Sequence, residues 1–348
     1  MGGISMKAAV LKKVGVIEIE DVPVPKPADD EVLVRIKSVG VCGSDIHYYR
    51  HGRIGTYVVE KPIILGHESS GEIVETGKGV RSLKIGDRVS LEPGIPCRKC
   101  IFCKTGRYNL CPDVVFMATP PVDGAFVEYV AFPEDFAFKL PDNVSFDEGA
   151  LIEPLAVGIY ASERAGIKPG LSAVILGAGP IGLVTLQAAK AYGAGPVAVL
   201  DISDFRLNMA RKLGADFVID SRDANALDKV LEAIGQGGAD VVFEAAGAVP
   251  TIQMTTRIAR RGGKVVLIGL SAKDQVEYNV VDVSGKELDV LGIFRYANVY
   301  RKAIDLVSAG KIGLKTMVTH HFPLEKTKEA LELADTKKDQ AIKVIVNP

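Results

Sequence analysis

Residues 172–182 read Ser-Ala-Val-Ile-Leu-Gly-Ala-Gly-Pro-Ile-Gly, and they are the strongest indication of the fold of the middle of the chain. An apolar run typical of a buried strand passes through a glycine-rich turn into a stretch compatible with a helix. A G-x-G-x-x-G pattern in that context is typical of a unit that binds the pyrophosphate of a dinucleotide at the helix N-terminus. The first glycine permits the turn, the second lets the phosphates approach, and the third lets helix and strand pack closely. The predicted cofactor-binding residues of the turn are Gly177, Gly179, Pro180, Ile181 and Gly182.

The next apolar run, 197–200, is followed directly by Asp201. A carboxylate at that strand end accepts hydrogen bonds from the adenosine ribose hydroxyls and repels a 2′-phosphate, so the sequence favours NAD over NADP. Arg206 leaves this preference open, because its guanidinium could bind a phosphate or stack on the adenine.

A regular alternation of strand-like and helix-like segments surrounds this motif. Apolar runs begin near Ser172, Pro196, Phe217, Asp240, Lys264 and Leu288. Helix-compatible stretches lie between them at 181–191, 204–213, 224–234 and 250–259. Strands that alternate with helices at this spacing form a parallel sheet covered on both faces. The sequence therefore predicts an α/β fold with a doubly wound, parallel-sheet Rossmann domain.

The chain before this region has a different pattern of residue types. Short β-branched runs at 32–36, 71–75, 88–91 and 126–130 are separated by proline and glycine, which predicts an antiparallel, barrel-like β domain. The apolar run 341–346 is expected to return and pair with that domain. The predicted domains are 1–154 together with 294–348, and 155–293.

Four of the chain's five cysteines fall in one window, spaced Cys97-x2-Cys100-x2-Cys103-x7-Cys111. Four thiolates close the tetrahedral shell of a zinc ion and leave no position for a substrate, so the window predicts a structural zinc site. A ferredoxin pattern, C-x2-C-x2-C-x3-C-P, is the alternative, since Pro112 follows the last cysteine. The last gap is seven residues rather than three, which disfavours an iron–sulfur cluster.

The fifth cysteine, Cys42, stands far upstream of this window and is followed by Gly66-His67-Glu68. A thiolate, an imidazole and a carboxylate leave one position of a zinc ion open, and an open position is where a metal does chemistry. Glu153 lies in an apolar segment where the two domains should join, and a buried acid usually has a partner. A zinc ion or its water would supply that partner.

Composition limits the classes of function. The chain has 348 residues, 47% of them hydrophobic, and a formal net charge of −1. This predicts a globular protein without the basic surface that nucleic acids or acidic membranes require. The uncharged stretch 169–189 is long enough to span a bilayer, but its central glycines and proline favour a buried strand, turn and helix. Residues 1–7 lack the apolar run of a secretory signal, so a cytoplasmic location is expected.

Taken together, these motifs resemble those of the zinc-dependent medium-chain dehydrogenases. The resemblance spans nearly the full length of the chain. In order, its motifs are Gly66-His67-Glu68, Gly86-Asp87-Arg88-Val89, the four-cysteine window and the G-x-G-x-x-G turn. Within the family, the chain is most similar to the polyol dehydrogenases. The marks of that branch are the run 42–48, Glu68 after the histidine, the run 118–124, Glu153-Pro154 and Phe294-Arg295-Tyr296.

The resemblance implies a GroES-like antiparallel β-barrel catalytic domain, a Rossmann domain, two zinc ions per chain, NAD and a homotetramer. It also implies that Cys42, His67 and Glu68 hold the catalytic zinc, and that Glu153 holds its water or alternates as a ligand. The implied polyol pocket contains Ser44, Tyr48, Phe116, Thr119, Glu153, Arg295 and Tyr296. Further implied cofactor contacts are Ala246, Ile268, Gly269, Leu270, Phe294 and Arg295.

The implied reaction is the reversible oxidation of a secondary alcohol of a polyol, of the sorbitol, xylitol or galactitol type, to a ketose. Hydride passes to NAD, and the proton leaves through Ser44 and His47 or through Glu153 and water. L-threonine, glucose and an aminocyclitol are alternative substrates for the same chemistry. A non-catalytic NAD-binding zinc protein and a zinc-free quinone reductase are disfavoured, because no zinc ligand is missing.

Overall fold

The computed structural model describes residues 5–348, so the expectation drawn from the N-terminal segment falls mostly outside the described residues. The chain divides into two compact units. The first comprises Met1–Glu153, Tyr300–Ala309 and Leu314–Pro348, and the second comprises Pro154–Val299 and Gly310–Gly313. The domain boundaries expected after residues 154 and 293 stay a prediction.

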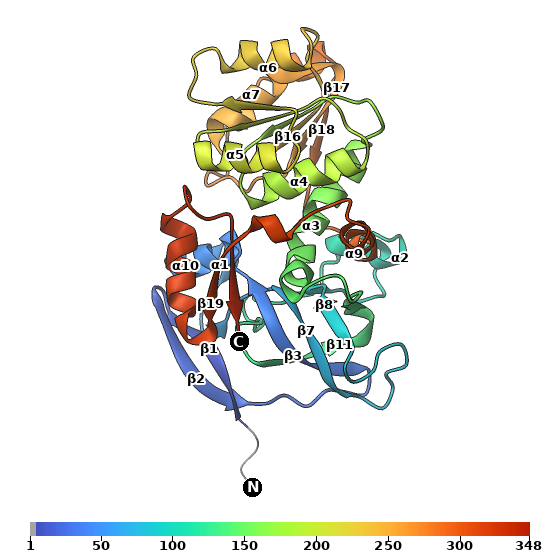
Figure 1. Ribbon diagram of the computed structural model, residues 1–348, viewed down its shortest axis with the longest axis vertical. Coiled ribbons are helices and arrows are strands. Elements are labelled where there is room, and N and C mark those ends of the chain that lie inside the picture. The colour runs from blue at the N-terminus through green and yellow to red at the C-terminus, as the bar shows by residue number, and fades with distance from the viewer. Residues whose placement is uncertain (1–4) are drawn as a thin grey trace. The chain divides into compact units, whose positions relative to one another are not determined.

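The first unit is built mainly from antiparallel strands (Figure 1). Its strands are β1 (Ser5–Lys13), β2 (Val16–Pro23), β3 (Glu31–Gly40), β4 (Arg53–Ile54), β5 (Tyr57–Val58), β6 (Ile63–Ile64), β7 (Glu68–Thr76), β8 (Arg88–Leu91), β9 (Gly94–Ile95), β10 (Val115–Phe116), β11 (Tyr129–Pro133), β12 (Ala137–Lys139), β19 (Val318–Pro323) and β20 (Lys343–Asn347). Its helices are α1 (Gly43–His51), α2 (Ile101–Lys104), α9 (Tyr300–Ser308) and α10 (Thr327–Thr336). Helix α3 (Phe146–Ala165) crosses the division between the units and contains Pro154.

The largest sheet of this unit has the order β12-β8-β7-β3-β20-β19, with β11 also paired to β3. The terminal strand returns as expected, because β20 pairs antiparallel with β3. The expected strand 126–130 is displaced, since β11 begins only at Tyr129. Phe126 instead hydrogen-bonds through its backbone to Ala9 and Leu65, which lie outside that sheet.

The second unit is a parallel sheet of order β15-β14-β13-β16-β17-β18. Helices α4 and α5 lie on one face of the sheet and α6 and α7 on the other (Figure 1). The predicted Rossmann architecture is therefore confirmed. Its elements are β13 (Ala173–Leu176), α4 (Pro180–Ala191), β14 (Val197–Asp201), α5 (Asp204–Lys212), β15 (Phe217–Asp220), α6 (Ala226–Ile234), β16 (Ala239–Glu244), α7 (Val249–Ile258), β17 (Ala259–Leu267), α8 (Val280–Gly285) and β18 (Asp289–Gly292).

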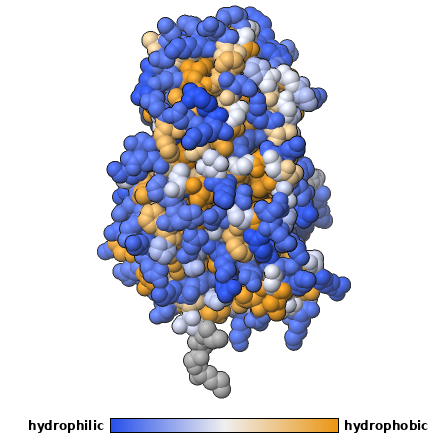
Figure 2. Space-filling view, viewed as in Figure 1, coloured by the Kyte–Doolittle hydropathy of each residue, from blue (hydrophilic) through white to orange (hydrophobic). Residues whose placement is uncertain are grey.

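Burial explains why the central strands are so apolar. Every residue of β13 and β14 is buried, because helices cover both faces of the sheet. Each unit has its own hydrophobic core, one gathered between the sheets of the first unit and one around β13, β14 and β16. Within residues 5–348, no helix has the length and apolar character needed to cross a membrane. On the face drawn in Figure 2, apolar residues are interspersed among hydrophilic ones.

Candidate metal and nucleotide sites

Two groups of side chains in residues 5–348 bring potential metal ligands together. In one of them, the ligand atoms of Cys42, His67 and Glu68 all lie within 4.8 Å of one another. Cys42 is the N-cap of α1, His67 precedes β7, and Glu68 begins that strand. The folded chain therefore assembles the three residues that the sequence singled out.

Asp45 holds the backbone beside two of these residues. Its carboxylate accepts hydrogen bonds from the backbone N–H groups of Cys42 and Gly66, both at 2.9 Å. The Oδ1 atom also lies 3.9 Å from Nδ1 of His67. Asp45 was not among the site residues predicted from the sequence, although Cys42-x-x-Asp45 matches the spacing of a helix capping box. Complete burial raises the pKa of Asp45, an effect that His67 opposes.

His67 is surrounded by negative charge. Burial lowers its pKa, but the Cys42 thiolate, Asp45 and Glu153 together outweigh burial and raise the pKa to about 10. Glu153 therefore lies close enough to act on this site, and the residue is 6% exposed. The surroundings of His67 thus favour a cation, and a zinc ion would supply that positive charge.

The donor set fits zinc. One thiolate, one imidazole and one carboxylate are all normal zinc ligands, and three protein ligands are typical of a catalytic site. The carboxylate atom Oε2 of Glu68 is buried and has no hydrogen-bond partner within residues 5–348. A buried anionic oxygen without a partner is costly, and a metal ion would remove that cost. Cys42, His67 and Glu68 would hold the ion.

A buried lysine that was not predicted as a site residue from the sequence lies beside this cluster. The Nζ atom of Lys343 donates to Oε1 of Glu68 at 2.5 Å. Burial lowers the pKa of Lys343, but the negative charges of Glu68, Cys42 and Glu153 outweigh burial and keep it above its usual value. The ammonium charge is therefore retained inside the protein.

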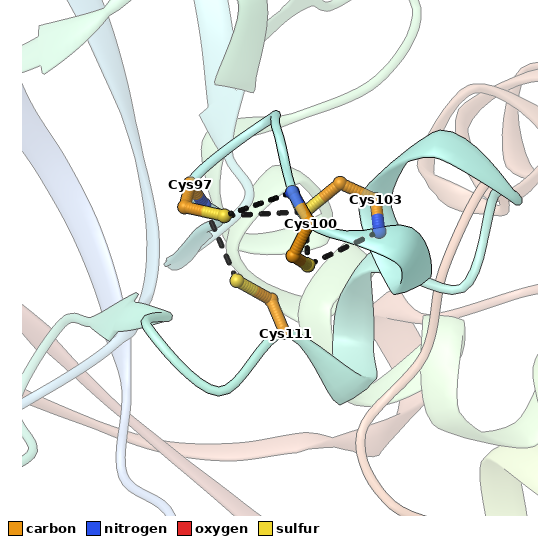
Figure 3. Close-up of side chains that lie close together, drawn as sticks. All are labelled: Cys97, Cys100, Cys103 and Cys111. Carbon is orange, nitrogen blue, oxygen red and sulfur yellow. Dashed lines mark hydrogen bonds between the residues drawn. The ribbon is translucent and has the colours of Figure 1, made fainter.

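The second group contains the four clustered cysteines, whose sulfur atoms also lie within 4.8 Å of one another (Figure 3). The Cys103 sulfur is 3.3 Å from that of Cys100 and 3.9 Å from that of Cys97. A tetrahedral zinc site with Zn–S bonds of about 2.3 Å needs sulfur atoms about 3.8 Å apart. Backbone N–H groups of Lys99 and Cys100 hold the pKa of the Cys97 thiol at about 7, whereas burial raises the pKa of the Cys103 thiol to about 12. The segment that carries these cysteines, residues 97–111, is called the four-cysteine lobe, and its geometry fits a closed zinc site.

A hydrogen bond ties this lobe to the neighbouring strand. The hydroxyl of Tyr108, which lies between Cys103 and Cys111, donates to Oε1 of Glu92 at 2.7 Å. Glu92 follows β8 and is 2% exposed. Burial raises its pKa to about 7, although the Tyr108 hydrogen bond opposes the rise.

The predicted substrate and relay residues fall in both units. Ser44, His47 and Tyr48 lie on α1 directly after Cys42. Phe116 lies beside His67, with ring centroids 5.6 Å apart. Thr119 and Glu153 complete the set in the first unit, whereas Arg295 and Tyr296 belong to the second unit.

The glycine-rich turn leaves no room for side chains at two of its positions. Gly177 has φ +102°, and a Cβ there would lie 2.9 Å from the Cβ of Ala246. A Cβ on Gly182 would lie 1.8 Å from the Gly177 carbonyl oxygen. Gly179 is instead open, because the nearest atom to a Cβ there is a guanidinium nitrogen of Arg206 at 3.7 Å. Gly179 is also the N-cap of α4. The open space between Gly179 and the Arg206 guanidinium, here called the phosphate cradle, is therefore positively charged and fits a pyrophosphate.

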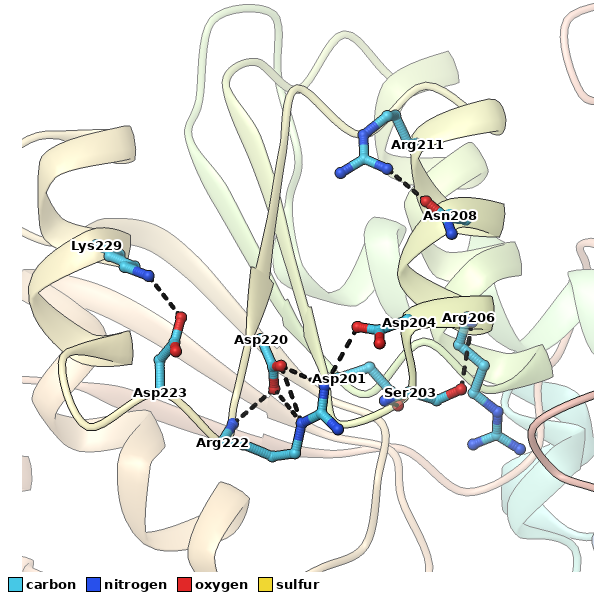
Figure 4. Close-up of polar contacts among 10 residues, drawn as sticks. All are labelled: Asp201, Ser203, Asp204, Arg206, Asn208, Arg211, Asp220, Arg222, Asp223 and Lys229. Carbon is cyan, nitrogen blue, oxygen red and sulfur yellow. Dashed lines mark hydrogen bonds and ion pairs between the residues drawn. The ribbon is translucent and has the colours of Figure 1, made fainter.

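Asp201 ends β14 beside this cradle (Figure 4). Its carboxylate accepts hydrogen bonds from the backbone N–H groups of Ala178 at 2.7 Å and Ser203 at 2.9 Å. Each carboxylate oxygen keeps a further acceptor position, which suits a ribose hydroxyl. The next strand end carries Asp220, whose carboxylate pairs with Arg222.

The remaining predicted cofactor residues follow the carboxyl ends of other strands of the same sheet, the edge at which such sheets bind nucleotides. Glu244, which ends β16, orders this edge by accepting hydrogen bonds from the N–H groups of Ala246 and Gly247. After β16 comes Ala246, after β17 come Ile268, Gly269 and Leu270, and after β18 come Phe294 and Arg295.

Comparisons with known proteins identify the family of the chain. Residues 28–142 match the family model described as the alcohol dehydrogenase GroES-like domain, and residues 180–309 match the model described as zinc-binding dehydrogenase. Over 344 residues, the chain is 48% identical to sorbitol dehydrogenase from Bacillus subtilis (strain 168), covering 99% of this chain and 98% of that protein.

Two solved structures from Escherichia coli share the fold over nearly their full length. One is ECK1772, an oxidoreductase/dehydrogenase of unknown specificity, with TM-score 0.95, 40% identity and 99% of each chain covered. The other is galactitol-1-phosphate dehydrogenase, with TM-score 0.89, 30% identity and coverage of 99% of this chain and 100% of that chain. The chain therefore belongs to the zinc-dependent medium-chain dehydrogenase family, in its sorbitol-dehydrogenase-like branch, and is an oxidoreductase with zinc and NAD as its cofactors.

Proposed function

We propose that the protein reversibly oxidises a secondary alcohol of a polyol, of the sorbitol, xylitol or galactitol type, to a ketose. One observation carries the proposal. Cys42, His67 and Glu68 converge within 4.8 Å in a chain that is 48% identical to a sorbitol dehydrogenase over 99% of its length. A site with one thiolate and one carboxylate suits a zinc ion that keeps a position for substrate.

The two metal clusters have different proposed roles. The four-cysteine lobe uses all its ligands on the metal, so it stabilises structure and does no chemistry. Cys42, His67 and Glu68 hold the catalytic zinc, with Glu153 beside them. Bound zinc supplies a Lewis acid that makes the substrate hydroxyl more acidic, and bound NAD+ accepts the hydride.

The reaction balances as alcohol plus NAD+ giving ketone, NADH and one proton. The C–H bond of the alcohol carbon breaks with its electron pair, and the O–H proton must pass to a group of the protein. Glu153 is one acceptor, because its carboxylate lies in the electrostatic field of His67 and Lys343. Ser44 and His47 form the alternative route, and burial together with His51 lowers the pKa of His47, which leaves it neutral and able to accept a proton.

The substrate class follows from the relatives and from the pocket chemistry. The sorbitol and galactitol-1-phosphate enzymes are named for acyclic polyols. We assign polyol binding to Ser44, Tyr48, Phe116, Thr119, Glu153, Arg295 and Tyr296. Most of these side chains offer hydrogen bonds, which a substrate with many hydroxyls requires.

Cofactor preference and assembly complete the proposal. Asp201 favours NAD over NADP, because its carboxylate would repel a 2′-phosphate.

A homotetramer in the cytoplasm is expected. The sheet edge at β18 supports assembly, since Val290 is 38% exposed there and Val280 and Val281 of α8 are 66% and 76% exposed. Light scattering coupled to size-exclusion chromatography measures the mass, and a 37.1 kDa species would exclude the tetramer.

The function is tested by incubating the purified protein with NAD+ and single substrates while following NADH. Sorbitol, xylitol and galactitol are compared with L-threonine and glucose, each with and without a zinc chelator. We expect NADH formation with at least one polyol and its loss with chelator. Turnover of L-threonine or glucose alone would overturn the polyol proposal, and chelator-resistant turnover would overturn the zinc site.

A further inference from the structure

Lys343 differs from every other lysine and arginine within residues 5–348, because it alone among them is buried. Its residue is 2% exposed. The ammonium donates to Oε1 of Glu68 at 2.5 Å and to the carbonyl oxygen of Val41 at 3.0 Å. A buried cation is tolerated only when it is paired and hydrogen-bonded, and both conditions hold here.

Strand register brings Lys343 to the proposed metal cluster. β20 pairs with β3, where Ile345 lies opposite Gly40. β3 also pairs with β7, where the same Gly40 lies opposite Glu68. The lysine and the carboxylate therefore approach each other across β3, inside the largest sheet of the first unit.

The two carboxylate oxygens of Glu68 have different surroundings. Oε1 accepts the Lys343 hydrogen bond, whereas Oε2 is buried and has no partner in the part of the chain that the structure describes. A Cβ on Gly40 would lie 2.0 Å from Oε2, so glycine at that position leaves the room that this oxygen occupies. Lys343 thus occupies Oε1 of Glu68 and leaves Oε2 available to bind a metal ion.

We propose that Lys343 is a positioning residue that weakens Glu68 as a zinc donor and thereby keeps the zinc reactive. The inference rests on the proposed ligand role of Glu68. The ammonium hydrogen bond draws negative charge from the carboxylate that would bind the metal. A weaker donor leaves more positive charge on the metal for polarising a hydroxyl. Lys343 therefore lowers zinc affinity and raises Lewis acidity.

The test is chelator competition on the zinc-loaded protein with Lys343→Met. We expect the catalytic zinc to bind about 10-fold more tightly, and kcat to fall about 10-fold with KM for NAD+ unchanged. The four-cysteine zinc serves as an internal reference that should not change. A lysine with a merely structural role predicts the opposite sign, because a loosened fold releases zinc more easily. Weaker binding of the catalytic zinc would overturn the proposal.

Two further variants separate charge from hydrogen bonding. Lys343→Gln keeps a donor without charge and should behave like Lys343→Met, whereas Lys343→Arg keeps the charge and should stay near wild type. If Lys343→Met does not fold, Lys343→Gln carries the same test. Lys286→Met is the matched control. It removes a lysine that donates to the carbonyl oxygens of Thr256 and Ala259 in the second unit, and it should leave zinc affinity unchanged.

A double-mutant cycle with Glu68→Gln tests whether Lys343 acts through Glu68. With the carboxylate charge removed, Lys343→Met should increase zinc affinity much less than in wild type. The absorption bands of the cobalt(II)-loaded protein should likewise shift with Lys343→Met only when Glu68 is present. Equal effects in both backgrounds would contradict the inference. Binding of a single zinc by wild type would instead overturn the proposed ligand set, so the two failures are distinguishable.

Discussion

Three negative side chains lie close enough to the buried His67 to raise its pKa. Cys42, Asp45 and Glu153 all act on the imidazole, and together they outweigh burial in setting its pKa. Lys343 supplies one compensating charge. A site of this charge is stable when a divalent cation joins it, which is the physical reason for expecting zinc there.

Replacing Glu153 with alanine tests the proton route. If Glu153 accepts the proton, kcat for the polyol should fall about 10²–10⁴-fold. The affinity for NADH should stay within about 3-fold, and NADH fluorescence is the direct measure because the chain has no tryptophan. Ser44→Ala is the companion variant. Intact turnover in Glu153→Ala together with a large loss in Ser44→Ala would assign the proton to the Ser44 and His47 route.

Glu92 predicts a pH-dependent stability. Burial raises its pKa to about 7 from 4.5, so the unfolded chain releases this proton before the folded chain does. The stability that the protonated acid contributes is therefore complete below pH 4.5 and is lost as pH rises through 7. Glu92→Gln does not titrate, so its melting temperature relative to wild type should rise between pH 4.5 and 7 and stay level above. A difference that does not change with pH would contradict the raised pKa.

The turn between β13 and α4 depends on close backbone contact rather than on side chains. The Gly177 carbonyl lies where a side chain on Gly182 would begin, and Gly179 caps the helix that the phosphates would approach. This element therefore binds its ligand through backbone N–H groups and the helix dipole.

Gly182→Ala should weaken NADH binding at least about 10-fold, because its Cβ would force the turn away from the helix. Gly285→Ala is the matched control, since a Cβ there meets nothing within 4 Å. Titrations followed by NADH fluorescence measure both variants. Equal affinities in the two variants would show that the turn tolerates a side chain.

The two units divide the chemistry between them. Cys42, His67, Glu68 and the four-cysteine lobe belong to the first unit, whereas the glycine-rich turn and Asp201 belong to the second. Each unit has a separate hydrophobic core. Metal binding and nucleotide binding therefore rest on independently packed cores.

Zinc removal should separate these functions. The catalytic site has three protein ligands and the lobe has four, so a chelator should remove the catalytic zinc first. Polyol oxidation should then fall more than about 100-fold while NADH affinity stays within about 3-fold. Loss of the second zinc should lower the melting temperature. Zinc content, activity and melting temperature measured on the same samples test this order, and simultaneous loss of both zinc ions would contradict it.

Features whose residues lie close together along the chain could be predicted from the sequence. The glycine turn, the strand and helix alternation and the four-cysteine spacing all fall within short windows, so local pattern was sufficient to predict the Rossmann fold and the lobe. The cluster of Cys42 with His67 and Glu68 was reached through the resemblance to a family as well as through residue type.

Contacts between residues far apart along the chain depend on how the elements pair and pack, and the sequence did not predict them. Lys343 meets Glu68 across 275 positions of sequence, and Asp45 meets the Gly66 N–H across 21. The displaced start of β11 has the same origin, because the backbone of Phe126 bonds to Ala9 and Leu65, which lie outside the sheet of β11. A local pattern shows that a strand is buried on one face or both, but it does not show which distant side chain the neighbouring strand brings to that face.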